Sequence, residues 1–268
     1  MIRAAFNISE LPFTKEIKTP QLFMHPQFQE FTSRIRLLCE NRGIGMFTGE
    51  VGCGKSTAIR AVLESLSPQT HRVVYLYRGM DNTGAFYSQI ACELSIIPKF
   101  RKPDVANQVL TAIAELYTQQ KILTVLVIDE AHLLKADIFD EIRLLHNNCY
   151  DSCDYLTTAL VGQPPLKKMI TLTKYLPLRQ RISVAGHIGA LSKEHAYKYF
   201  EHQLTTVNAS SKIFLDNAIE TIICASKNIP RMINVIALKS MYHAAIDKKQ
   251  SIVDQECVMG VLEELGLK

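Results

Sequence analysis

One eight-residue segment constrains this chain more than any other, because it follows the pattern G-x-x-x-x-G-K-[ST] at every position. The segment consists of Gly49, Glu50, Val51, Gly52, Cys53, Gly54, Lys55 and Ser56. Residues 44–48 before it predict a short buried strand, and residues 56–66 after it predict a helix. A strand, a glycine-rich loop and a helix in this order are typical of sites that bind the phosphates of a nucleoside triphosphate.

The residues of this phosphate loop have separate roles in holding a nucleotide. The glycines let backbone N–H groups close around the phosphates, and the N-terminus of the following helix adds a partial positive charge. Lys55 is expected to reach the β- and γ-phosphates, and the Ser56 hydroxyl to bind Mg²⁺, with Thr57 beside it in the first helical turn. The loop therefore predicts ATP and Mg²⁺ as cofactors.

Strands and helices alternate along residues 1–191. Besides the strand before the loop, apolar runs predict strands at residues 72–77, 122–128, 155–161 and 187–191. Helical patterns fall at residues 27–40, 83–94 and 104–119. Such alternation implies βαβ crossovers, so we expect an α/β nucleotide-binding domain with a five-stranded parallel sheet flanked by helices.

From residue 192 the pattern predicts helices only. They fall at residues 193–204, 215–225, 230–246 and 253–265. We therefore expect residues 192–268 to form a small all-helical lid domain. Hydrophobic residues make up 47% and charged residues 21%, which is typical of a soluble globular protein. No apolar run approaches the roughly 20 residues of a membrane span, so we expect a cytoplasmic protein with no membrane partner.

Seven cysteines are scattered along the chain without a C-x-x-C pair. This spacing predicts reduced thiols rather than disulfides. His146, Cys149 and Cys153 are close enough in sequence to suggest a metal site, but no fourth ligand lies nearby. We expect these three to be packing residues.

Two adjacent carboxylates, Asp129 and Glu130, follow the apolar strand at residues 122–128. Ligands of parallel sheets collect at the carboxyl ends of strands, so Asp129 is expected beside Mg²⁺. Glu130 is suited to polarise the water that attacks the γ-phosphate, which favours ATP hydrolysis over transfer to a small molecule. Residues 129–132 also spell the signature of one helicase group, but 268 residues leave no room for its second ATP-binding domain. His132 is then expected either to be a packing residue or to support the acidic pair without contacting the nucleotide.

Four polar residues further along the chain are candidates to contact the γ-phosphate. Gln163 follows the strand at residues 155–161, where the alternative is a simple strand-to-helix turn. Arg179 and Arg181 precede the last strand, from which an arginine can project toward the γ-phosphate of a neighbouring subunit. Arg231 begins a helix of the lid and offers a further cation to the same phosphates.

In combination these motifs resemble those of AAA+ ATPases, and within that superfamily the ExeA-like group, which includes the transposition regulators TniB, TnsC and, more distantly, MuB. The matching segments are residues 11–13, 48–56, 128–132, 160–164, 180–182 and 229–231. The resemblance implies that Gln163 is the first sensor, Arg181 the arginine finger with Arg179 as its alternate, and Arg231 the second sensor.

Two residues depart from the pattern of this group. Asn228 stands where the group usually has glycine, and Pro165 where an acidic residue is common. Neither belongs to the residues that would contact the nucleotide.

The resemblance also implies partners. It predicts a homo-oligomer, as a ring or helical filament, because a trans-acting arginine requires subunits stacked head to tail. The transposition relatives assemble on duplex DNA, which implies sequence-nonspecific DNA binding, a transposase and a target-selection protein as partners. Lys99, Arg101, Lys102 and Lys121 are the candidate DNA contacts, and a solvated basic loop is the alternative.

Two other functions are compatible with the same motifs. A secretion-assembly ATPase of the ExeA type would act on the cell envelope, and its relatives continue into a membrane span that is not seen here. A nucleotide-controlled switch with little turnover would need Lys55 and Asp129 but not Glu130. ATP hydrolysis measured with and without duplex DNA distinguishes these functions from regulation of transposition.

Overall fold

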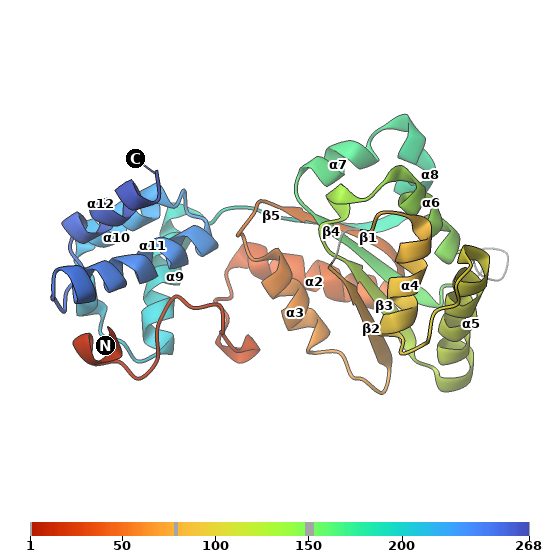
Figure 1. Cartoon of the computed structure of the whole chain (residues 1–268), viewed down its shortest axis with the longest axis horizontal. Helices are drawn as coiled ribbons and strands as arrows, with labels where there is room; N and C mark the ends of the chain where they lie inside the picture. The colour runs from red at the N-terminus through yellow and green to blue at the C-terminus, as the bar shows by residue number, and fades with distance from the viewer. Residues whose placement is uncertain (1, 78–79, 148–152, 268) are drawn as a thin grey trace. The chain divides into compact units, whose positions relative to one another are not determined.

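The computed structural model describes residues 2–77, 80–147 and 153–267, which divide into two compact units (Figure 1). The sheet unit comprises residues 27–51 and 55–188. The helical unit comprises residues 1–26, 52–54 and 189–268. In the described part of the chain, no helix combines the length and apolar character needed to cross a bilayer.

Five parallel strands form the sheet of this unit, in the spatial order β2-β3-β4-β1-β5. Their bounds are Gly43–Gly49 (β1), His71–Leu76 (β2), Leu123–Ile128 (β3), Leu156–Gly162 (β4) and Ile182–Ile188 (β5). All six residues of β3 and all seven of β4 are buried, as expected for strands covered on both faces. The predicted five-stranded parallel sheet is therefore confirmed.

The last strand differs from its sequence-based bounds. It covers residues 182–188 instead of the expected 187–191. As an edge strand it alternates between exposed residues, such as Ser183, and buried residues, such as Val184. Its sequence therefore lacks the continuous apolar run that predicted the other strands.

Helices cover both faces of the sheet (Figure 1). Their bounds are Pro26–Asn41 (α2), Lys55–Leu63 (α3), Thr83–Glu93 (α4), Lys102–Gln120 (α5), Ala136–Leu145 (α6), Pro165–Ile170 (α7) and Leu176–Arg179 (α8). Met46 and Leu126 belong to the core formed with α4, α5 and α6. Phe47 points to the opposite face, because successive strand residues alternate, and its ring meets that of Phe31 in α2 edge-on.

The helical unit contains α1 (Ile2–Ala5), α9 (Lys193–Thr206), α10 (Asp216–Ala225), α11 (Pro230–Tyr242) and α12 (Gln255–Glu264). The helices predicted after residue 192 are thus present. Side-chain caps explain where two of them begin: Ser192 accepts the His195 N–H before α9, and Asp254 accepts the Cys257 N–H before α12. Pro230 occupies the first position of α11, where its missing N–H costs nothing.

The N-terminal segment packs in the helical unit, although the sequence grouped it with the nucleotide-binding domain. Phe13, with 3% of its surface exposed, is part of the core of this unit. Its ring centroid lies 4.8 Å from that of Phe200 and 5.9 Å from that of Phe214. These aromatic contacts join residues about 190 positions apart, so no local pattern could predict them.

Candidate functional site

The phosphate loop joins β1 to α3, in the order that the sequence predicts. Lys55 is the first residue of α3 and only 7% of its surface is exposed. Its Nζ donates hydrogen bonds to the carbonyl oxygens of Gly49 at 2.7 Å and Glu50 at 2.9 Å. The lysine is therefore held inside the curve of the loop, where a phosphate would lie. Ser56 and Thr57 follow in the first turn of α3.

The centre of the loop needs glycine for two physical reasons. Gly52 and Gly54 have φ values of +83° and +97°, in the left-handed region that side chains disfavour. A Cβ atom on Gly52 would also lie 2.8 Å from the Cβ of Arg231. Within the helical unit, the Arg231 N–H donates to the Gly52 carbonyl at 3.2 Å. The geometry thus fits a loop whose backbone, rather than its side chains, faces phosphate.

Asp129 follows β3, and three donors orient its carboxylate. The Tyr75 hydroxyl donates to Oδ2 at 2.7 Å, and the Ser56 hydroxyl approaches the same oxygen at 3.4 Å. The Glu130 N–H donates to Oδ1 at 2.9 Å. A hydroxyl and a carboxylate are oxygen ligands of the kind that Mg²⁺ prefers, so Ser56 and Asp129 fit the predicted metal site.

Tyr75 was not among the predicted site residues. It lies on β2, next to β3 in the sheet, with Val127 as its register partner. Burial, followed by the hydrogen bond to Asp129, raises the pKa of the Tyr75 phenol well above its ordinary value. The phenol therefore stays protonated at neutral pH and remains a donor.

Glu130 has a left-handed backbone conformation, with φ +53° and ψ +34°. A residue other than glycine is strained there, and such strain concentrates at functional sites. The Glu130 side chain is 45% exposed, and its Oε2 lies 3.3 Å from His132 Nδ1 and 3.4 Å from Gln163 Nε2. The structure thus brings the acidic residue and the candidate first sensor together.

His132 contacts both Glu130 and Gln163, in line with the expected supporting role beside the acidic pair. Its side chain is 11% exposed, and Nδ1 accepts the Gln163 N–H at 3.4 Å. Gly162, at the end of β4, allows this approach, because a Cβ there would lie 3.2 Å from the His132 backbone nitrogen. Glu130, His132 and Gln163 therefore form one polar cluster at the carboxyl edge of the sheet.

The candidate arginine fingers lie at the amino ends of the strands, whereas the phosphate loop lies at their carboxyl ends. Arg179 ends α8, and Arg181 directly precedes β5. The seven residues of β5 run about 20 Å to the carboxyl edge, at about 3.3 Å per residue. Since this distance exceeds the length of an arginine side chain, Arg181 cannot reach the phosphate loop of its own sheet unit.

A second group of charges surrounds Asp154 at this amino edge. The hydrogen bond to His146 lowers the pKa of Asp154, and the charges of Arg181 and Arg42 lower it further. His146 is 3% exposed and also bonds Thr158 at 2.9 Å. Its ring is therefore buried and hydrogen-bonded inside the sheet unit. Cys149 of the suggested metal group lies outside the described residues.

The four candidate DNA contacts do not form one patch. Arg101 pairs with Asp104 at 2.9 Å, and Lys102 pairs with Glu141. Lys121 directly follows the 19-residue α5, about 28 Å from Lys102 at the first position of the helix, and its Nζ lies 6.0 Å from the Tyr117 ring centroid. Gln108 fixes the backbone of the loop before α5, accepting the Lys99 N–H and donating to the Ile97 carbonyl.

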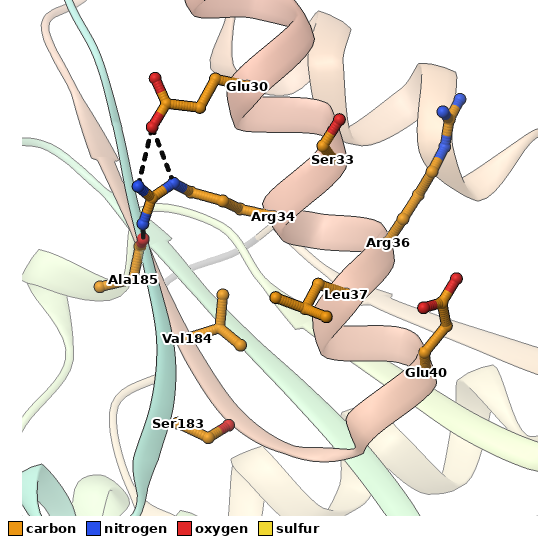
Figure 2. Close-up of a pocket in the computed structure, with 9 residues that line it drawn as sticks. All are labelled: Glu30, Ser33, Arg34, Arg36, Leu37, Glu40, Ser183, Val184 and Ala185. Carbon is orange, nitrogen blue, oxygen red and sulfur yellow. Dashed lines mark hydrogen bonds and ion pairs between the residues drawn. The ribbon is translucent and has the colours of Figure 1, made fainter.

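A groove of about 720 Å³ lies elsewhere, between α2 and the edge strand β5 (Figure 2). The residues that line it include none of the predicted site residues. Arg34 crosses the groove, donating to Glu30 at 2.7 Å and to the Ala185 carbonyl at 2.6 Å. Arg34, Glu30 and the Ala185 carbonyl thus use their hydrogen bonds on one another. The candidate site is therefore the cluster of predicted residues at the carboxyl ends of the strands.

Comparison with known proteins finds relatives in sequence and in structure. The chain is 26% identical over 271 residues to "General secretion pathway protein A" of Aeromonas hydrophila, covering 98% of this chain and 48% of that protein. The chain thus spans about half the length of this curated relative.

Solved structures share the fold at low identity. Cdc6p from Pyrobaculum aerophilum superposes with a TM-score of 0.74 at 16% identity, covering 94% of this chain and 70% of that one. The Aeropyrum pernix ORC1 protein in complex with DNA gives a TM-score of 0.72 at 12% identity, covering 94% and 68%. Both confirm the α/β fold with its parallel sheet. A family model described as "AAA domain" matches residues 36–170, half of the chain, and the protein therefore belongs to this AAA family.

Proposed function

We propose that the protein is a Mg²⁺-dependent ATPase. One observation carries the proposal: the metal-site pair Ser56 and Asp129 and the polar cluster of Glu130 and Gln163 meet at the sheet edge that also holds Lys55. The AAA family membership supports it. A binding switch without turnover would not require the strained Glu130 beside Gln163.

Each residue then has a defined part in hydrolysis. Lys55 and the loop N–H groups bind the phosphates, and Ser56 and Asp129 hold Mg²⁺, which neutralises charge on the phosphate oxygens. Glu130 accepts a proton from the attacking water. Gln163, within 3.4 Å of Glu130, orients that water.

Glu130→Gln tests this assignment. We expect ATP binding to stay at the parental level and hydrolysis to fall roughly 10²- to 10⁴-fold, because the amide cannot accept the proton. Binding is measured with a fluorescent ATP analogue and hydrolysis by phosphate release. Glu115→Gln, the same change on the exposed side of α5, is the control. Parental hydrolysis by Glu130→Gln would rule out the assignment.

We infer that the ATPase acts in a secretion-type assembly process. The relative with that name aligns with 98% of the chain, which includes both units. This supports the ExeA-type function over regulation of transposition, although the sequence motifs favoured the latter.

DNA binding is the second candidate, and one surface feature favours it. Ile97 and Phe100 are 89% and 103% exposed, next to Lys99. Exposed aromatic side chains beside cations can stack on bases or enter the minor groove. The hydrolysis assay above, repeated with linear duplex DNA, decides between the candidates. Turnover stimulated by DNA favours this role, and turnover indifferent to DNA favours the secretion-type role.

A shared active site is part of the proposed mechanism. Arg181 lies about 20 Å from the carboxyl edge of its own sheet, so an arginine finger at this position would act on a neighbour. A guanidinium there would stabilise the charge that develops on the γ-phosphate. We therefore propose that the protein hydrolyses ATP as a head-to-tail homo-oligomer.

A further inference from the structure

Tyr75 is a polar residue of the sheet that belongs to none of the nucleotide-binding motifs. It lies on β2, half-buried, and its hydroxyl donates to Asp129 Oδ2 at 2.7 Å. The backbone keeps the two residues together, because the Asp129 N–H donates to the Leu76 carbonyl at 2.8 Å. The contact therefore joins two neighbouring strands at the edge where the phosphate loop lies.

The two carboxylate oxygens of Asp129 accept hydrogen bonds from different donors, at different distances. Oδ1 accepts the Glu130 N–H at 2.9 Å. Oδ2 accepts the Tyr75 hydroxyl at 2.7 Å, whereas the Ser56 hydroxyl is 3.4 Å away. The phenol is thus the closer of the two side-chain donors to Oδ2.

We propose that Tyr75 is a positioning residue that sets the affinity of the site for Mg²⁺ by orienting the Asp129 carboxylate. The inference rests on the proposed ATPase function. Groups that hydrogen-bond a ligating carboxylate fix its rotation, and their loss typically weakens metal binding 10- to 100-fold. Tyr75 itself does not contact the nucleotide in this proposal.

The chain offers a matched control one residue beyond β2. Tyr77 is 60% exposed, and its ring centroid lies 6.4 Å from that of Tyr75. Tyr77→Phe removes the same hydroxyl from a neighbouring phenol without removing the bond to Asp129. Tyr77→Phe therefore controls for the loss of a phenol hydroxyl close to Tyr75.

The experiment measures binding of N-methylanthraniloyl-ATP by the full chain, first in EDTA and then during titration with MgCl₂. We expect Tyr75→Phe to bind the analogue in EDTA as the parent does. The MgCl₂ concentration for half-maximal tightening should rise roughly tenfold. Tyr77→Phe should change it less than twofold. An unchanged midpoint in Tyr75→Phe would overturn the proposal while leaving nucleotide binding intact.

Asp129→Asn distinguishes positioning from a general structural effect. If Tyr75 acts through the carboxylate, Tyr75→Phe should produce no further shift in the Asp129→Asn background. A second, equal shift there would show that the hydroxyl acts by another route and overturn the proposal. Failure of the parent to bind the analogue at all would instead overturn the ATPase function, and the inference with it.

Discussion

His25 is a buried histidine of the helical unit, 6% exposed, near the rings of Phe23 and His195. Burial, followed by the charge of His195, lowers the pKa of His25 from 6.5 to about 4. Between these two values the unfolded chain binds more protons than the folded protein. We therefore expect the contribution of His25 to the free energy of unfolding to be fully present above pH 6.5. This contribution should be lost as the pH falls toward about 4.

Urea unfolding at a series of pH values measures this slope. His25→Gln removes the titrating ring, so it should flatten the slope between pH 6.5 and about 4, whatever it does to the stability at pH 7. A slope retained in full by His25→Gln would contradict the expectation.

At the residue scale, Glu130 shows which features the local sequence predicts and which it does not. The adjacent acids after an apolar strand predicted both carboxylates, because strand and acids are contiguous in the chain. Neither the left-handed backbone of Glu130 nor its approach to His132 could be predicted. Both follow from how the end of β3 packs beside the end of β4, where Gly162 leaves room.

At the element scale, the N-terminal segment is a structural part of the helical unit. Phe13→Ala should lower the free energy of unfolding of this unit by about 3–5 kcal/mol, because it removes a buried ring packed against Phe200 and Phe214. Urea unfolding followed by circular dichroism measures the loss. Phe100→Ala, at a fully exposed phenylalanine, should change it by less than about 0.5 kcal/mol. Equal effects of the two variants would mean that Phe13 is not in this core.

The edge strand β5 shows why one element was displaced by several residues in the sequence-based prediction. Its polar positions interrupt the apolar run, and its register is set by pairing with β1. Arg34 of α2 donates a hydrogen bond to the Ala185 carbonyl on the unpaired side of the strand (Figure 2). A cation at this place blocks the addition of a foreign strand, which exposed edges otherwise invite.

At the scale of the whole molecule, hydrolysis should depend on neighbouring subunits. We expect Arg181→Ala to lose ATP hydrolysis by about 10³-fold or more and to keep ATP binding, because its own phosphate loop is unaltered. Lys55→Ala should lose binding. Mixtures should regain activity, because a Lys55→Ala subunit supplies its intact arginine to an Arg181→Ala pocket.

Phosphate release across mixing ratios measures this rescue, with Arg179→Ala in place of Arg181→Ala as the matched comparison. Rescue of only one of these variants identifies the finger. A lack of rescue at every ratio would count against a shared site.

Local patterns in the chain were enough for the phosphate loop, for four of the five strands and for the acidic pair, because each depends on residues adjacent in sequence. The Tyr75–Asp129 hydrogen bond, the place of Phe13 among the C-terminal helices and the bounds of β5 required the folded structure. They depend on strand order, register and side-chain packing between distant segments. The pattern of residues within one segment therefore cannot predict such contacts.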